Sequence, residues 1–328
     1  MASGRTATMV SGFVHRPGHH CGSTALRNLL GFHGAEISEE LAFGLGAGAC
    51  FYYLSGGLSP TRFTNGRTAR LEEGFLELTD APLRLRTASD PEDSWRLARE
   101  VVDEGRPVLL LTDLYYLDHY GNSAHFPGHA VVLAGYDDEF AYVSDTAFDE
   151  LQRTSLAGLA RARHGQHPFY PLAGQMIDVP GEAPSVASLR AAAPAAIARA
   201  AQLMLEPDLG EVEGLPALRR FAAEVGSWPQ TAADWSWSAR FNYQVIERRG
   251  TGGGNFRTLY SRFLAEVGHA EGAAIATEAA AAWTALAAEL FAASESDEPD
   301  AAGWRRIAAA ADRVLADEER LWSRLAAA

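Results

Sequence analysis

Lysine is missing from this sequence of 328 residues, so its 28 basic residues are all arginine. Aspartate and glutamate number 42, which gives a formal net charge of −14 at pH 7. Because nucleic-acid binding needs a basic surface that neutralises phosphates, this charge argues against a nucleic-acid partner. It also disfavours contact with anionic membranes. An acidic protein partner is still compatible with it, because arginines can cluster locally.

Cysteine is scarce, and Cys21 and Cys50 are the two that the chain contains. One possible disulfide is a weak framework for a chain of this length, so we expect reduced thiols and a cytoplasmic protein. Residues 1–14 lack the apolar segment of a signal peptide, and no run of about 20 apolar residues occurs. We therefore expect no membrane-spanning segment. The sequence leaves the oligomeric state open.

The first half of the chain mixes the patterns of helices and strands. Apolar spacing predicts helices over Cys21–Phe32 and Ser94–Glu104, and Ser38 is a typical N-cap for a short helix between them. Apolar or alternating runs predict strands over residues 107–112, 130–135 and 140–144. Residues 44–57, rich in glycine and aromatic side chains, are predicted to form a loop.

The second half is rich in Ala, Leu, Glu and Arg with helical periodicity. Helices are predicted over residues 185–205, 215–225, 235–247, 255–267, 271–294 and 301–326. Four prolines mark Gly165–Pro184 as the linker between the halves. We therefore expect an α+β domain over residues 15–165 and an all-α domain over residues 185–328.

Cys21 lies between a polar loop and the start of a predicted helix. The unpaired N–H groups and the macrodipole of a helix start favour a thiolate, as does a neighbouring imidazolium. His15, His19 and His20 all lie within six residues of this thiol. Cys21 is therefore a candidate nucleophile. The alternative is a buried, inert cysteine beside surface histidines.

His129 and Asp145 are predicted to be neighbours across a hairpin. His129 opens one apolar strand, and Asp145 ends the next after a polar turn at residues 137–139. An imidazole that takes up the thiol proton and a carboxylate that orients it are the partners that a cysteine nucleophile needs. The alternative is a histidine of the core beside an aspartate of a turn.

The sequence around these residues resembles motifs of known protein families. The helix opening Cys21-Gly-Ser-Thr-Ala-Leu, the strand Gly128-His-Ala-Val-Val-Leu-Ala-Gly-Tyr-Asp and the exit Val143-Ser-Asp are similar to papain-like cysteine peptidases, especially the leader peptidases fused to bacteriocin exporters. Residues 15–150 more specifically resemble the N-terminal domain of the butirosin biosynthesis protein H family. The motif from Gln244 to Arg257, which contains Gly-Thr-Gly-Gly-Gly-Asn-Phe, resembles the domain of unknown function that accompanies it.

The resemblance implies a papain-like fold and an acyltransferase. A member of the family moves an amino-acid-derived acyl group from an acyl carrier protein to an amine of an aminoglycoside. Carried over to this chain, Cys21 would be the acylated nucleophile, His129 the general base and Asp145 the acid that orients it. The implied partners are a carrier protein with a phosphopantetheine arm and a small-molecule amine acceptor, with no cofactor.

One position departs from the papain-like pattern. About six residues before the nucleophile, papain-like enzymes have a glutamine that donates to the oxyanion, and this chain has His15. An imidazole N–H can donate, so His15 and His20 are candidates for the oxyanion hole or for substrate contact. Tyr52 and Tyr53 are candidates for a wall of the acyl pocket, although aromatic runs also occur in cores.

The glycine-rich motif has two interpretations. Glycines between arginines and before a helix are typical of an anion site, with Arg249, Gly252, Gly253, Gly254, Asn255 and Arg257 as the candidate residues. A phosphopantetheine phosphate or a substrate carboxylate would be its ligand. The alternative is a tight turn between helices.

A metal site is not expected. His15, His19, His20 and Cys21 fit none of the usual zinc spacings, and His119 and His125 would complete a site only by folding back. Two alternatives to acyl transfer stay open. The same triad is compatible with a peptidase or amidase that uses water as the acceptor. The chain is also compatible with a non-catalytic module that binds a carrier protein.

Overall fold

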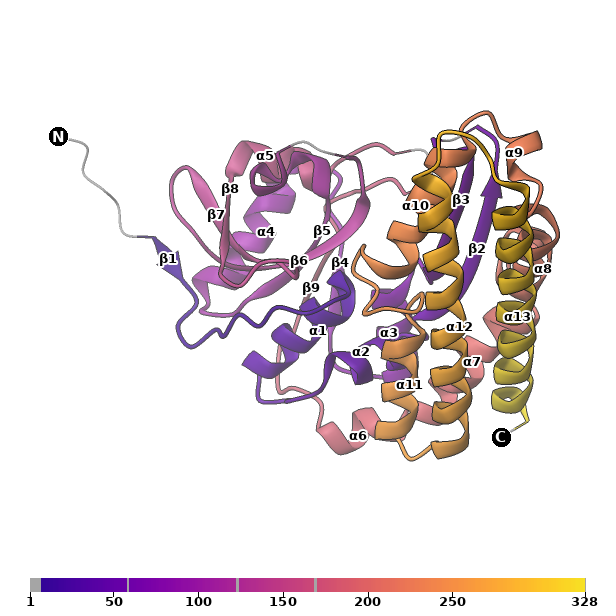
Figure 1. The fold of residues 1–328 in the computed structure, drawn as a ribbon. Helices are drawn as coiled ribbons and strands as arrows, with labels where there is room; N and C mark the ends of the chain where they lie inside the picture. Colours follow the sequence, from indigo (N-terminus) through magenta and orange to yellow (C-terminus); the bar gives the residue numbers. More distant parts are fainter. Residues whose placement is uncertain (1–6, 58, 122–123, 168–169, 328) are drawn as a thin grey trace. The chain divides into compact units, whose positions relative to one another are not determined.

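The computed structural model describes residues 7–57, 59–121, 124–167 and 170–327. The chain divides into two compact units (Figure 1). The first, which we call the sheet unit, comprises Met1–Ala42 and Asp80–Leu189. The second, which we call the helical unit, comprises Phe43–Thr79 and Arg190–Ala328.

This division differs from the contiguous ranges expected from the sequence. Residues 43–79 belong with the C-terminal helices because they form the hairpin of β2 (Ala49–Ser55) and β3 (Arg62–Arg67). This hairpin packs against α8 (Gly214–Val225) and α10 (Trp235–Glu247). The predicted loop over residues 44–57 is therefore wrong, since half of it is the strand β2.

The sheet unit is built on a seven-stranded sheet whose described pairings are all antiparallel. The strand order is β4-β9-β5-β6-β7-β8, and β1 pairs with β6. The strands are β1 (Thr8–Met9), β4 (Arg84–Arg86), β5 (Val108–Asp113), β6 (Pro127–Tyr136), β7 (Phe140–Ser144), β8 (Gln152–Ser155) and β9 (Met176–Asp178). The position of β9 inside the sheet shows that the predicted linker, residues 165–184, is part of this unit.

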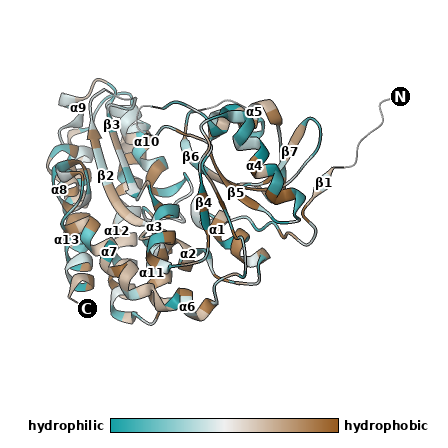
Figure 2. Ribbon diagram, turned by 180° about the vertical axis from the view of Figure 1, so that it is seen from behind, coloured by the Kyte–Doolittle hydropathy of each residue, from teal (hydrophilic) through white to brown (hydrophobic). Residues whose placement is uncertain are grey.

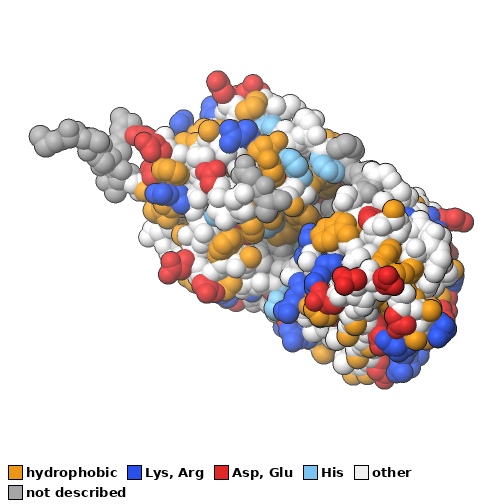
Figure 3. Space-filling view, turned by 45° about the horizontal axis from the view of Figure 1, so that its top comes forward, with side chains coloured by type: hydrophobic (Ala, Val, Ile, Leu, Met, Phe, Trp, Pro, Cys, Tyr) orange, Lys and Arg blue, Asp and Glu red, His pale blue; other side chains and the backbone are white. Residues whose placement is uncertain are grey.

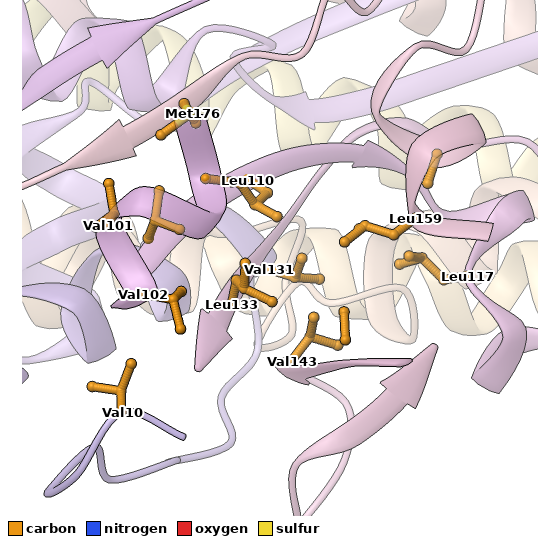
Figure 4. Packing of buried hydrophobic residues seen from close by; sticks show 14 residues of the cluster. Val10, Val101, Val102, Leu110, Leu117, Val131, Leu133, Val143, Leu159 and Met176 are labelled. Atoms are coloured by element: carbon orange, nitrogen blue, oxygen red, sulfur yellow. The ribbon is translucent and has the colours of Figure 1, made fainter. Parts of the chain in front are cut away.

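Helices cover both faces of the central strands. Leu110, Val131 and Val143 pack in one hydrophobic cluster with residues of α4 (Pro91–Asp103) and α5 (Leu156–Arg163) (Figure 4). Leu109 is the neighbour of Leu110 in the strand, so its side chain points to the opposite face of the sheet. It is fully buried there, where α1 (Cys21–Phe32) packs against β5 and β6. Burial of both faces explains why these strands read as continuous apolar runs. The sheet thus gives the Cys21 helix a rigid base.

The rest of the sheet unit is made of short segments. They are α2 (Glu39–Leu45), which runs on into the other unit, and the 3-10 turns η1 (Leu114–Tyr116) and η2 (Asp118–Tyr120). Ser38 caps α2 as predicted, because its hydroxyl accepts from the Leu41 N–H at 2.9 Å.

The helical unit contains the β2–β3 hairpin and the C-terminal helices. The helices are α3 (Leu71–Thr79), α7 (Ala193–Leu205), η3 (Gly210–Val212), α8, α9 (Trp228–Thr231), α10, α11 (Arg257–Glu266), α12 (Ala270–Ser294) and α13 (Ala301–Ala326), with α6 (Val186–Ala191) at the unit boundary. Figure 2 shows hydrophobic and hydrophilic residues alternating along α13, as expected of a helix with one buried side. The expected fold class is confirmed: the chain is α+β, with a helical C-terminal region.

One helix, α12, is long and apolar enough to cross a membrane by length and composition alone. Half of its most apolar window is buried, and it packs against α10, α11 and α13. These contacts are those of a core helix. Alanine supplies most of the apolar character and lets the neighbouring helices approach closely.

Exposed arginines pair with carboxylates of the protein's own surface. Examples are Arg219 with Glu319 at 2.8 Å and Arg324 with Glu271 at 2.7 Å. Figure 3 shows acidic and arginine side chains interspersed on the face drawn. Each such pair contributes about 0–1 kcal/mol to stability, so this pairing mainly neutralises local charge.

Candidate active site

Cys21 is the first residue of α1, as the sequence predicted. His20 precedes it with extended backbone angles, and its Nδ1 accepts a hydrogen bond from the Ser23 N–H at 3.2 Å. A side chain in this N-cap role satisfies one of the free donors of the first turn. Cys21 is partly exposed and lies at the positive end of the helix.

A buried carboxylate shapes the loop before Cys21. Glu39 accepts from the backbone N–H groups of His19, at 2.9 and 3.0 Å, and of His20, at 2.6 Å. A Cβ on Gly18 would lie 2.2 Å from the Thr24 hydroxyl and 2.6 Å from Glu39, so any other residue would force these side chains to move. Sequence reasoning placed Glu39 in a helix start and missed this second role.

His129 and Asp145 meet across the β6–β7 hairpin, as the hairpin geometry predicted. His129 Nε2 lies 3.0 Å from each carboxylate oxygen of Asp145. Both residues are buried, with exposed fractions of 5% and 0%. A buried charge-assisted hydrogen bond of this kind holds the ring in one orientation.

The orientation of His129 leaves Nδ1 for Cys21. Nε2 is taken by Asp145, and a side-chain hydrogen bond joins His129 to Cys21. Burial of His129 disfavours its charged form, but the charge of Asp145 and the hydrogen bonds to Asp145 and Cys21 outweigh burial and raise its pKa to about 10. The site therefore favours the protonated form of His129 beside Cys21.

Asp145 has two further partners that sequence reasoning missed. His119 Nε2 lies 2.9 Å from Oδ2, and the Tyr120 hydroxyl donates to Oδ1 at 3.1 Å. Burial raises the pKa of Asp145, but the charge of His129 and the hydrogen bonds from His119 and His129 keep it well below the ordinary range. Both partners lie in η2, whose sequence carries no periodic signal. From the sequence, His119 is a candidate only as a metal ligand.

His15 does not supply an oxyanion donor in this structure. Its Nδ1 lies 2.7 Å from the Ser144 hydroxyl and its Nε2 2.9 Å from the Phe148 carbonyl, so both ring nitrogens are engaged. The Gly18 N–H also donates to the Thr146 carbonyl at 3.1 Å. These contacts tie the nucleophile loop to the segment that carries Asp145. His15 therefore links the segments that carry Cys21 and Asp145.

Two models of known protein families match this chain. Residues 20–146, which include the three triad positions, match the model of the family described as "Butirosin biosynthesis protein H, N-terminal". Residues 157–325 match the model of the "Domain of unknown function (DUF4872)". The chain belongs to this two-domain family. The family assigned from sequence motifs is thereby confirmed.

Other comparisons add little. None of the curated proteins matches the sequence. A crystal structure from Bacillus anthracis, described as a C39-like peptidase, aligns with a TM-score of 0.38 and 16% identity, over 55% of this chain and 100% of its own. A likeness this low carries no argument about the activity of this chain.

Aromatic rings surround the His129 imidazole. Tyr120 lies edge-on to it, with ring centroids 5.6 Å apart, and Phe126 lies 6.4 Å from it. Phe148 packs on Tyr120 at 5.4 Å. Phe126 is 39% exposed, which makes it the most accessible apolar side chain of this group. These three residues, none of them predicted from sequence, form the apolar surroundings of the base.

Tyr52 and Tyr53, the predicted wall residues, lie in β2 of the helical unit. Their hydroxyls donate to Glu213 at 2.6 Å and to Glu224 at 2.8 Å. Burial is the largest cause that raises the pKa of both phenols, and these hydrogen bonds raise it further. Both hydroxyls are therefore occupied inside their own unit. Cys50 is buried there too, and burial raises its pKa to about 12, as for an inert cysteine of the core.

The glycine-rich loop, which lies within the DUF4872 match, is a turn between α10 and α11. Five consecutive residues of this loop have positive φ: Gly252, Gly253, Gly254, Asn255 and Phe256. Residues that have a β-carbon rarely adopt positive φ. Its N–H groups are used locally, because Gly253 donates to Thr251 and Asn255 donates to the Ile246 carbonyl. The Gly254 N–H donates to the Glu247 carboxylate at 3.2 Å.

The arginines of this motif are also engaged. Arg257 is fully buried, forms two hydrogen bonds with Glu318 at 2.7 and 3.0 Å, and donates to the Cys50 and Gly66 carbonyls. Arg249 donates to Gln244. These contacts favour the alternative, a tight turn that joins the β2–β3 hairpin to α13, over the anion site, which stays a prediction.

No three metal-ligating side chains gather in a metal-binding arrangement within the ranges that the structure describes. His15 and His20 are engaged as above. His125 pairs with Asp113, with Nδ1 2.7 Å from the carboxylate, and stacks on Tyr115 at 4.0 Å. The expectation that no metal or cofactor takes part stays a prediction.

Proposed function

We propose that this protein is an acyltransferase in which Cys21 carries the acyl group between a thioester donor and an amine acceptor. The observation that supports this most is the Cys21–His129–Asp145 arrangement, with an accessible thiol at a helix start and its base fixed by a buried carboxylate. Our choice of acyl transfer over hydrolysis rests on the family resemblance. The matched family model is named after a protein of butirosin biosynthesis.

In the first step the Cys21 thiolate attacks the thioester carbonyl. The bond between the carbonyl carbon and the donor sulfur breaks, and the departing thiolate takes a proton from the His129 imidazolium. The products are an acyl-Cys21 thioester, the free thiol of the donor and a neutral His129. A phosphopantetheine arm of a carrier protein is the donor that the family implies.

In the second step an amine attacks the acyl-Cys21 carbonyl. Neutral His129 takes the proton that the amine loses, the new amide bond forms, and Cys21 leaves as a thiolate. The thiolate–imidazolium pair is thereby restored. The sum of the two steps is a thioester and an amine converted to an amide and a thiol.

The oxyanion of each tetrahedral intermediate would lie at the N-terminal end of α1. N–H groups in the first turn of a helix have no partner within the helix, and the macrodipole favours negative charge there. Since His15 is engaged elsewhere, we propose that this end of α1, where Cys21 lies, stabilises the oxyanion. Oxyanion donors are typically worth about 100-fold or more in turnover.

The first test is intact-protein mass spectrometry after mixing the protein with a panel of acyl-thioesters. Wild type and Cys50→Ala should gain the mass of one acyl group, whereas Cys21→Ala should gain none. His129→Ala should acylate slowly. Acylation of Cys21→Ala, or no adduct with any thioester on a slowly reacting thiol, would contradict the proposal. Rapid loss of the acyl group to water would favour the peptidase or amidase alternative.

A further inference from the structure

The carboxylate of Asp145 is shared by three side chains, and two of them are not members of the triad. His129 Nε2 is equidistant from both oxygens at 3.0 Å. His119 contacts Oδ2 at 2.9 Å and the Tyr120 hydroxyl contacts Oδ1 at 3.1 Å. One extra donor on each oxygen leaves the carboxylate little freedom to rotate about its own axis.

The segment that carries these donors is itself anchored. In η2 the Asp118 N–H donates to the Thr154 hydroxyl at 3.1 Å, and the Asp118 carboxylate accepts from the Ser155 N–H at 2.6 Å. Both partners belong to β8 and the residues next to it. The rings of His119 and Tyr120 pack on Phe148 at 5.2 and 5.4 Å. The sheet therefore fixes where both donors point.

Packing alone does not explain a histidine at position 119. Its side chain is 5% exposed, and its Nδ1 is buried with no hydrogen-bond partner among the described residues. An unpartnered buried nitrogen costs stability that a leucine of similar size would avoid. The bond from Nε2 to Asp145 is the contact that only a donor can make.

We propose that His119 and Tyr120 are positioning residues for Asp145. They hold the carboxylate so that it accepts from His129 Nε2 and keeps His129 Nδ1 directed at Cys21. The inference rests on the proposed role of Cys21 as nucleophile and adds two residues that act through Asp145.

The test compares two substitutions at position 119. His119→Leu removes the donor, whereas His119→Gln places an amide N–H where Nε2 stood. Tyr120→Phe removes the other donor and keeps the ring. Tyr142→Phe is the matched control, because Tyr142 lies in β7 and its hydroxyl donates to Asp137, a turn residue, at 2.7 Å. Cys21 alkylation by iodoacetamide, measured by peptide mapping at mildly acidic pH, reports the thiolate without a known substrate.

His119→Leu should slow Cys21 alkylation about 10- to 100-fold, the range expected when a hydrogen bond to a charged group is lost. His119→Gln should stay close to wild type, Tyr120→Phe should be intermediate, and Tyr142→Phe should equal wild type. With an acyl donor in hand, kcat should fall with alkylation while KM changes little. Melting temperatures of all variants show how much is due to unfolding.

Three results would overturn the inference. An unchanged rate of Cys21 alkylation in His119→Leu would show that Asp145 is held in place without this donor. Faster alkylation in His119→Leu would show that the hydrogen bond from His119 only weakens the interaction of Asp145 with His129. Equal losses in His119→Leu and His119→Gln, in step with melting temperature, would show a structural role. A wild-type Cys21 that reacts like an ordinary exposed thiol would instead overturn the proposed function, and this inference with it.

Discussion

Replacing Asp145 by asparagine probes the electrostatics of the site most severely. The substitution keeps the size of the side chain and removes the charge that holds His129 protonated. The pKa of His129 is raised from the ordinary value of 6.5 to about 10, and this difference corresponds to a free energy of about 5 kcal/mol in favour of the imidazolium. Burial opposes this preference, so Asp145 and Cys21 together supply more than the net value.

The expected loss follows from that figure. If Asp145→Asn removes only half of the preference, the equilibrium constant for the thiolate–imidazolium pair falls about 70-fold. Cys21 alkylation at mildly acidic pH should fall accordingly, and kcat should fall at least as far. Asp137→Asn is the matched control, because Asp137 is a turn carboxylate whose loss leaves the triad intact.

The pH dependence has a definite sign. The pKa of His129 is raised in the folded protein, so the stability that its proton contributes is complete below pH 6.5 and is lost as pH rises through about 10. Wild-type Cys21 should therefore alkylate rapidly already at mildly acidic pH, well below the ordinary thiol range. Asp145→Asn should move the rise in rate toward the ordinary thiol pKa. An Asp145→Asn profile that coincides with wild type would refute this reasoning.

Two further substitutions test the supports of the two units. Arg257→Met leaves the buried carboxylate of Glu318 without its cation, which should cost about 3–5 kcal/mol in urea unfolding followed by tryptophan fluorescence; a cost below 1 kcal/mol would contradict a buried clamp. Gly18→Ala forces a Cβ to within 2.2 Å of the Thr24 hydroxyl and should slow Cys21 alkylation more than Gly181→Ala, where a Cβ meets nothing within 4 Å. Equal rates in the two glycine variants would show that the nucleophile loop can adapt.

Much of the fold could be predicted because its signals are local. Apolar periodicity with a polar cap located α1 at Cys21–Phe32, and strand alternation located β7 at Phe140–Ser144. The long helices α10 and α13 also have the predicted bounds. In each case the buried face of one element is sufficient to define it.

The segments that were missed depend on distant partners. The glycine and aromatic residues in and around β2 favour a loop. The segment is a strand because it pairs with β3 and packs against α8. β9 has only three residues and follows a proline-rich stretch, so its place between β4 and β5 is set by the sheet. No local pattern could have shown which unit either segment joins.

The candidate site divides in the same way. The pairing of His129 with Asp145 follows from hairpin geometry, which is local. The donors His119 and Tyr120 approach Asp145 from 25 to 26 positions away in the sequence, through a 3-10 turn with no periodicity. His15 had the right spacing for an oxyanion donor, and the contacts of its ring nitrogens decide against that role.

The most direct test of the central claim is a chase of the isolated acyl-enzyme. Wild type would be acylated with a thioester, freed of excess donor, and then mixed with an amine or with buffer alone, and the protein and products would be followed by mass spectrometry. The account predicts that the Cys21 adduct is stable in buffer and disappears with the amine as an equal amount of amide forms. Loss of the adduct at the same rate in both, with free acid as the product, would contradict acyl transfer.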